Sequence, residues 1–350
     1  MTVAFILFFV VVKQLYTAIS PDELHVGRQR LTSCISDLQD WCASRRLQLN
    51  ASKTELIWFG SRTSLRRLSL AHSTLMIDSV VVQPTDVVRD LGVLLDSELN
   101  LKQHVNRIAS TCFYHLRRLR QLKRHVNVEV MKRLISAFVF SRLDYCNGIL
   151  SGLPLSTIAP LQRVQNAAAR LVLGLSRSDH VRPALKELHW LPVVYRIKFK
   201  LALVMFTIHT HQCSDYLTDS VHHYSYNDPA RYRLRSATGT NYSVPRTRTK
   251  FGDTAFSVDG PVVWNSLPAA VRHADSLHSF KRRLKSHFLA CVLMTDSVMP
   301  FRSGFDFRAY MYREGTKLPS TTTSTATIPS YILTALSKQS YPRGRNLYTY

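Results

Sequence analysis

The chain has 350 residues, which is enough to bury a sizeable core and to form two or three domains. It carries 46 Lys and Arg residues against 23 Asp and Glu residues, a formal net charge of +23. Such an excess indicates a polyanionic partner, with nucleic acid as the favoured class and an anionic membrane surface as the minor alternative. The six cysteines are scattered without a C-x-x-C pair, which argues against a disulfide scaffold or a zinc ribbon and fits an intracellular location, nuclear or cytoplasmic.

The N-terminal stretch at 3–12 is apolar throughout. It is too short to cross a bilayer, which needs about 20 residues. It also lacks the preceding basic residues and the small-residue cleavage site of a secretory signal. Its Val, Phe and Ile content favours a buried strand. A signal or membrane anchor is the alternative.

Next along the chain, the spacing of apolar residues predicts a helix from Pro21 to about Arg46, with Ser20 as N-cap and Glu23 closing a capping box. Short strands are predicted at 47–49 and 56–59, on either side of a turn. We expect further strands, namely a hairpin of 75–77 with 80–82 and one strand over 87–95 that Gly92 interrupts.

From about residue 100 the pattern becomes helical. Helices are predicted at 101–122, at 130–145, at 158–172 with Gly174 as C-cap, and at 193–209. The region 213–260 is predicted to be loop-rich, and one more helix is expected at 277–293. The Ser- and Thr-rich tail that follows is predicted to be disordered.

The segment 99–128 contains no Asp or Glu. Its apolar residues share one helical face, so the opposite face can offer cations to phosphates in a sequence-independent, salt-sensitive contact. A solvated basic face is the alternative reading. The cations are Lys102, Arg107, Arg117, Arg118, Arg120, Lys123 and Arg124.

Other clusters give weaker indications. Cations at 231–250 alternate with Tyr232 and Tyr242, which predicts either stacking on bases or a disordered loop. The basic run at 281–285 is read as a nuclear signal or a helix surface. His209, His211 and Cys213 alternate along the chain, but they follow a helix, and we expect no metal site there. The sequence has neither a nucleophile elbow nor a glycine-rich phosphate loop, so no catalytic residue is predicted.

Five segments carry a family resemblance. They contain LNASKTE at 49–55, LGV at 91–93, SRLDYCN at 141–147, LQRVQNAAARL at 161–171 and GPVVWNSLP at 260–268. In this order they resemble the reverse transcriptase of non-LTR (LINE-type) retrotransposons of the jockey and chicken-repeat type, and the last two are the most specific. The similarity runs from about residue 14 to residue 290 and matches the C-terminal part of that polymerase, the end of the palm and the thumb.

The resemblance implies roles for some residues. Lys53 corresponds to a palm lysine that contacts the phosphates of the incoming nucleotide, although from its own surroundings in the sequence it reads as a surface lysine in a turn. Leu91 and Gly92, with Val93, correspond to the hairpin that grips the primer end. The basic helix at 101–124 corresponds to the start of the thumb, which lies along the template–primer duplex.

The resemblance also shows a departure at the catalytic strand. The family has a Tyr-Ala-Asp-Asp-Thr block before Gln14-Leu15-Tyr16, and here residues 9–13 read FVVVK. Those aspartates help to hold two Mg²⁺ ions, which stabilise the attacking and leaving oxygens. Valine offers no oxygen donor to Mg²⁺. We therefore expect a truncated element with no catalytic residue, no metal site and no cofactor.

Together these observations predict an α+β fold. An unrelated apolar segment (1–13) precedes a truncated polymerase palm of one helix and short antiparallel strands (14–98), whose strands we expect to lack sheet partners. A mainly α-helical thumb-like domain (99–212), a basic region with a C-terminal helix (213–292) and a disordered tail (293–350) follow.

The function predicted from the sequence is that of a catalytically inactive remnant of an RNA-directed DNA polymerase from a transposable element. It would bind RNA or an RNA–DNA hybrid weakly and without sequence preference, and it would have no small-molecule substrate. The alternatives are a co-opted nucleic-acid-binding or interaction protein, and a protein tethered to a membrane through residues 3–12.

Overall fold

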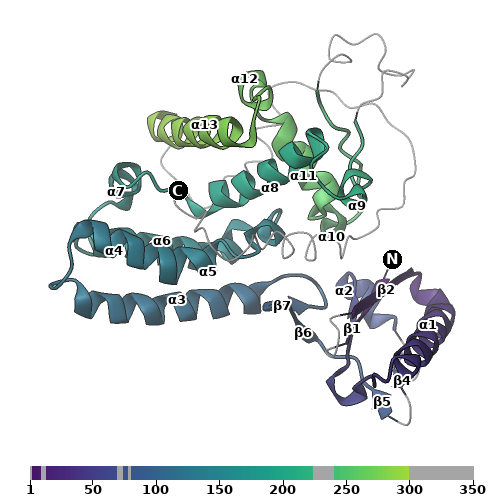
Figure 1. The fold of residues 1–350 in the computed structure, drawn as a ribbon. Coiled ribbons are helices and arrows are strands. Elements are labelled where there is room, and N and C mark those ends of the chain that lie inside the picture. Colours follow the sequence, from purple (N-terminus) through teal and green to yellow (C-terminus); the bar gives the residue numbers. More distant parts are fainter. Residues whose placement is uncertain (1, 9–12, 69–73, 78–79, 224–239, 299–350) are drawn as a thin grey trace, which may run out of the picture.

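The computed structural model describes residues 2–8, 13–68, 74–77, 80–223 and 240–298. Small antiparallel sheets occupy the N-terminal third, and helices make up the rest of the described chain (Figure 1). The predicted α+β class is therefore confirmed. The predicted disordered tail lies almost wholly outside the described residues.

The first sheet has three strands in the order β2-β1-β3, all antiparallel. The central strand β1 pairs with one neighbour on each side. Val3, for example, lies opposite Ala18 and also opposite Phe59. The predicted N-terminal strand is thus present, and it supplies the sheet partner that we expected β3 to lack. The bounds are β1 (Thr2–Phe8), β2 (Lys13–Ile19) and β3 (Glu55–Phe59).

Helix α1 (Leu24–Ser44) packs on this sheet after the 3-10 turn η1 (Pro21–Glu23). Its buried side chains join Ile19, Leu56 and Trp58 in one apolar core. A Cβ on Gly27 would lie 2.5 Å from Cγ2 of Ile19, so glycine allows the close approach of α1 to β2. The predicted capping box is wrong, because the side chain of Ser20 makes no capping hydrogen bond.

Two hairpins follow. The predicted pair β4 (Leu75–Ile77) and β5 (Val80–Val82) is confirmed. The single strand predicted over 87–95 is instead a hairpin of β6 (Val87–Asp90) and β7 (Val93–Asp96). Its two turn residues both have positive φ, 46° at Leu91 and 88° at Gly92. A two-residue type I′ turn requires this geometry, and an extended strand cannot continue through it. The strand predicted at 47–49 is absent, since those residues do not pair with any strand of the described chain.

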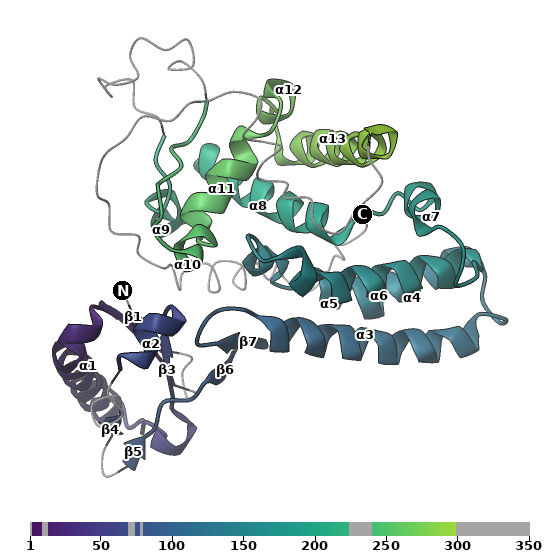
Figure 2. The same ribbon diagram turned by 180° about the vertical axis from the view of Figure 1, so that it is seen from behind.

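A layer of helices comes next, and its long members run side by side (Figures 1 and 2). The helix predicted over 130–145 is divided by a π-helical turn, η4. Gly174, at φ 74°, is the C-cap that we predicted for α6. The bounds are α3 (Lys102–Leu122), α4 (Val128–Ile135), η4 (Ser136–Phe140), α5 (Ser141–Leu143), η5 (Asn147–Leu150), α6 (Leu155–Leu173) and α7 (Val181–Glu187).

The C-terminal helices pack around α8 (Val193–His209), whose bounds agree with the prediction. Phe199 and Phe206 of α8 share a buried core with Trp264 and Phe280. The region predicted to be loop-rich therefore contains short helices that contribute to a core, although 224–239 lie outside the described residues. The bounds are α9 (Asp215–Thr218), α10 (Lys250–Asp253), α11 (Phe256–Asn265), α12 (Ala269–Arg272) and α13 (Leu277–Val298).

The apolar cores cross two of the predicted domain boundaries. Val93 and Leu95 of the β6–β7 hairpin belong to the same core as α3, α4 and α6. The core around α8 continues to Phe288. Within the described ranges, no helix is both long enough and apolar enough to span a bilayer.

Candidate nucleic-acid interface

Helix α3 has one buried face and one exposed face. Val105, Ala109, Cys112, Leu116 and Leu119 are buried against α4, α6 and η4. The start of the helix is fixed by a carboxylate of β7. Oδ1 of Asp96 accepts the backbone N–H of Leu101 at 2.7 Å, and Oδ2 accepts that of Asn100 at 2.9 Å. The hairpin and α3 are therefore held in one orientation.

The exposed face carries five of the cations predicted from the sequence. At 100° per residue their positions fall within an arc of about 160° opposite the buried side chains. All five are solvent-exposed, and we call this surface the basic face. Its members are Lys102, Arg107, Arg117, Arg118 and Arg120, whereas Arg124 is exposed in the turn that follows α3.

Lys123 was predicted to belong to this set, but it lies elsewhere. It follows the last residue of α3, and its Nζ lies 3.0 Å from the position that a Cβ on Gly174 would occupy. Gly174 ends α6, and the C-terminal end of a helix carries partial negative charge. The ammonium group of Lys123 therefore stabilises the end of α6 and is oriented away from the basic face.

One part of the basic face is lined by aromatic rings. A guanidinium nitrogen of Arg118 donates to the hydroxyl of Tyr114 at 3.0 Å, and its Cζ lies 5.8 Å from the ring centroid. Tyr114 contacts His115 edge to face, and His115 stacks on Phe138 of η4. Sequence reasoning missed Tyr114, and it placed Phe138 within a regular helix over 130–145, because the π-helical turn leaves no trace in the apolar spacing.

The residues assigned through the family resemblance are only partly brought together. Leu91 and Gly92 form the tip of the β6–β7 hairpin, and β7 packs against α3. Lys53 ends the 3-10 turn η2 (Ala51–Lys53), which Asn50 caps by accepting the backbone N–H of Lys53 at 3.2 Å. Lys53 is exposed, and η2 contacts β5 in the N-terminal part of the molecule.

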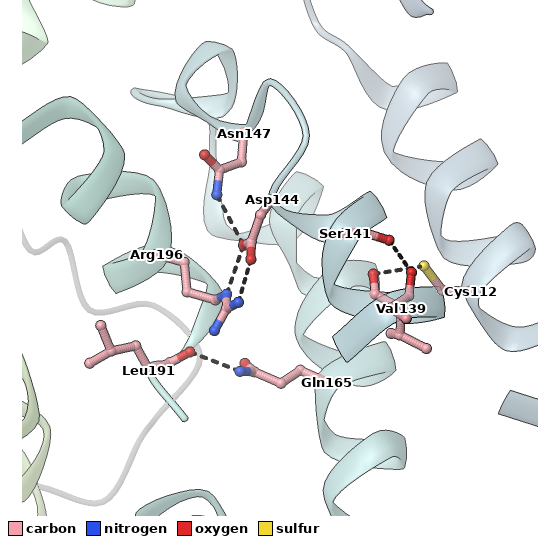
Figure 3. Close-up of polar contacts among 9 residues, drawn as sticks. Cys112, Val139, Ser141, Asp144, Asn147, Gln165, Leu191 and Arg196 are labelled. Atoms are coloured by element: carbon pink, nitrogen blue, oxygen red, sulfur yellow. Dashed lines mark hydrogen bonds and ion pairs between the residues drawn. The ribbon is translucent and has the colours of Figure 1, made fainter. Parts of the chain in front are cut away.

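The motif SRLDYCN contributes a buried ion pair (Figure 3). Asp144 accepts two bonds from the guanidinium of Arg196 on α8, with Nε at 2.8 Å. Both side chains are almost completely buried, and the guanidinium also lies over the ring of Phe140. The side-chain amide of the fully buried Gln165 donates to the carbonyl of Leu191 at 2.8 Å. The most buried polar groups of the segments 141–147 and 161–171 therefore hold α5 and α6 to α8.

The motif GPVVWNSLP also performs a structural role. Nε1 of the buried Trp264 donates to the carbonyl of Thr240 at 2.9 Å. Asn265 makes two bonds to the backbone of Tyr242, accepting its N–H at 2.9 Å and donating to its carbonyl at 2.8 Å. The motif thus ties the segment around 240–242 to α11.

The second basic cluster is only partly described. Arg231, Tyr232, Arg233 and Arg235 lie outside the described residues. Tyr242 is 1% exposed and lies with its ring centroid 3.8 Å from that of His223, so the prediction that it stacks on bases is wrong. In the run at 281–285, Arg283 donates to the carbonyls of Ala270 and His273, as expected of a helix surface that holds α12.

No group of three or more His, Cys, Asp and Glu side chains in the described residues could hold a metal ion. Burial lowers the pKa of His209, and the neighbouring His223 and His211 lower it further. Residues 9–12, where the resemblance places the catalytic carboxylates, lie outside the described residues.

No protein-family model, no curated protein and no solved structure matches this chain.

Proposed function

We propose that this chain is related to the palm and thumb of non-LTR retrotransposon reverse transcriptases and that it binds nucleic acid through the basic face of α3 without catalysing nucleotidyl transfer. The observation that supports binding is that five exposed cations lie on one helical face, in a segment without any acidic residue. Cations arranged in this way contact phosphates irrespective of base sequence.

The proposed absence of polymerase activity rests on the residues that precede Gln14. Val11 and Val12 stand where the resemblance places two metal-binding aspartates. Incorporation of a labelled nucleotide by the purified chain on a primed RNA template, in the presence of Mg²⁺, would contradict it.

A salt titration tests the binding function. The full chain is titrated into a fluorescent RNA–DNA hybrid at about 50 and 200 mM salt, a range over which five phosphate contacts weaken binding by about 500-fold. Replacing Arg117, Arg118 and Arg120 by Ala should weaken binding at both concentrations and flatten the dependence on salt, because about three fewer counterions are released.

A matched control removes the same charge from another part of the molecule. Arg28, Arg30 and Arg45 are exposed on α1 or at its end. Their triple replacement by Ala should leave the salt slope close to that of the unmodified chain. Equal losses in the two triple variants would show that net charge, and not the basic face, determines binding.

A further inference from the structure

We propose that Tyr114, His115 and Phe138 form an aromatic ledge beside the basic face that stacks unpaired bases, so that this surface prefers a single strand to a duplex. This inference rests on the proposed function and adds a ligand class to it.

The three rings form a continuous aromatic surface. The ring centroids of Tyr114 and His115 are 5.4 Å apart with planes at 75°, and those of His115 and Phe138 are 5.5 Å apart with planes at 26°. The two outer residues are open to solvent, with 47% of Tyr114 and 40% of Phe138 exposed. Flat apolar surface therefore remains available at both ends of the ledge.

The π-helical turn brings Phe138 into this position. Ile135, Val139 and Phe140 around it are buried, whereas Phe138 lies outside the core. A guanidinium nitrogen of Arg142 donates to the carbonyl of Phe138 at 2.8 Å and stabilises the turn. Turns of the π type are rare and occur frequently at functional sites, so the exposed ring is the product of a specific local geometry.

Two arginines provide charge complementarity to a phosphate backbone. Arg118 bonds to Tyr114, and Arg142 bonds to the carbonyl of Phe138. Burial lowers the pKa of His115, and the nearby positive charges of Arg142 and Arg118 lower it further, which favours the neutral imidazole. The two guanidinium groups thus lie beside the ledge, where they can contact phosphate. Alternating cations and aromatic rings are typical of surfaces that bind single strands.

The geometry discriminates against a duplex. Paired bases are already stacked on one another and do not offer their faces, whereas bases of a single strand can be splayed onto side chains. A duplex can use only the cations of the basic face. A single strand can use the cations and the ledge together.

The test compares two ligands with the full chain. These are a single-stranded RNA of mixed sequence and the RNA–DNA hybrid of the same sequence, both fluorescently labelled and measured at one salt concentration. The double variant Y114A/F138A should bind the single strand at least about tenfold more weakly, the range expected for loss of base–aromatic stacking. Its affinity for the hybrid should change by less than about twofold.

Two controls separate stacking from other effects. Y114F keeps the ring and removes the hydroxyl that Arg118 contacts, so it should bind the single strand nearly as well as the unmodified chain. Trp41 is similarly exposed on α1, and W41A should not alter either affinity. Circular dichroism of each variant establishes that it is folded.

The outcomes distinguish the two proposals. If the unmodified chain binds neither ligand, the proposed function fails and the ledge fails with it. If it binds both and Y114A/F138A changes neither affinity, or changes both equally, only the ledge is refuted. A self-associating chain that Y114A/F138A converts to a monomer would show that the ledge is an interface between copies, which also overturns the inference.

Discussion

The hydroxyl of Tyr145 donates a 2.6 Å hydrogen bond to the backbone carbonyl of Leu91, which lies 54 positions earlier in the chain. The bond joins the tip of the β6–β7 hairpin to the segment that follows α5. It connects two elements that the family resemblance assigned to separate parts of a polymerase, the primer-gripping hairpin and the thumb. In this structure they share one apolar core, so the hairpin is held by core packing along its strands and by the hydrogen bond at its tip.

Replacing Tyr145 by Phe should lower the free energy of unfolding by about 0.5–1 kcal/mol, the usual contribution of one hydrogen bond at a partly exposed site. The local effect should be larger than the global one. Hydrogen exchange at the hairpin amides should accelerate, while exchange in the core of α6 should change little. Uniform acceleration in both places would mean that the bond does not act on the hairpin in particular.

Leu91 occupies a backbone conformation that is unfavourable for its side chain. Its φ of 46° is followed by 88° at Gly92, and Asn-Gly is the preferred sequence for such a turn. L91N should therefore raise the free energy of unfolding by about 0.5–1 kcal/mol in denaturant titrations. Because the carbonyl of Leu91 is retained, the bond from Tyr145 should persist. G92A is the opposite control, and it should destabilise the chain, since alanine disfavours positive φ.

Several helices could be predicted from the sequence because their apolar residues repeat regularly. The bounds of α8 agree with the prediction at both ends, and α6 ends at the predicted Gly174. The π-helical turn could not be predicted in this way, since the buried Met131, Ile135, Val139 and Leu143 around it keep a helical spacing. The family resemblance implied the β6–β7 hairpin, but the residue pattern predicted a single strand, because a leucine at the first turn position is an unusual choice for positive φ.

The sequence predicted most of the cations of the candidate site but not the arrangement of its aromatic side chains. Five of the seven cations predicted on the basic helix are on the basic face, because helical periodicity alone places them opposite the apolar stripe. Lys123 and Arg124 are the exceptions, because α3 ends before them. The position of the Lys123 side chain depends on how the end of α6 packs near it, which local spacing does not show. The stacking of His115 on Phe138 depends on how η4 packs against α3, and local spacing carries no information about that.

The contributions of the buried Asp144 and Arg196 to the free energy of unfolding should be strongly coupled. D144N leaves a buried guanidinium without its counter-charge, while the ammonium group of Lys285 lies close enough to repel it. The expected loss is about 3–5 kcal/mol of unfolding free energy.

The double variant D144N/R196M should lose less than the sum of the two single losses, since it removes the charge as well as its partner. Strictly additive losses in this cycle would show that the two side chains do not stabilise each other.

His104 should make the stability of the chain depend on pH. It is buried at the start of α3, where its Nδ1 accepts the backbone N–H of Leu94 at 3.4 Å and so helps to join α3 to β7. Burial, with a further effect of the positive charge on Arg107, lowers the pKa of His104 from 6.5 to about 4. In the unfolded chain the imidazole regains its ordinary pKa.

Between pH 6.5 and about 4 the unfolded chain therefore binds a proton that the folded chain does not. The stability contributed by the neutral imidazole is fully present above pH 6.5 and decreases as the pH falls, by up to about 3 kcal/mol over this interval. H104Q cannot be protonated, so the difference in unfolding free energy between it and the unmodified chain should shrink steadily from pH 7 to pH 4.

His25 is exposed on α1, and H25Q should keep the pH dependence of the unmodified chain. Parallel curves for H104Q and the unmodified chain would mean that His104 keeps an ordinary pKa in the fold. Its burial against β7 would then carry no electrostatic cost, and the acid sensitivity of the chain would have to come from other groups.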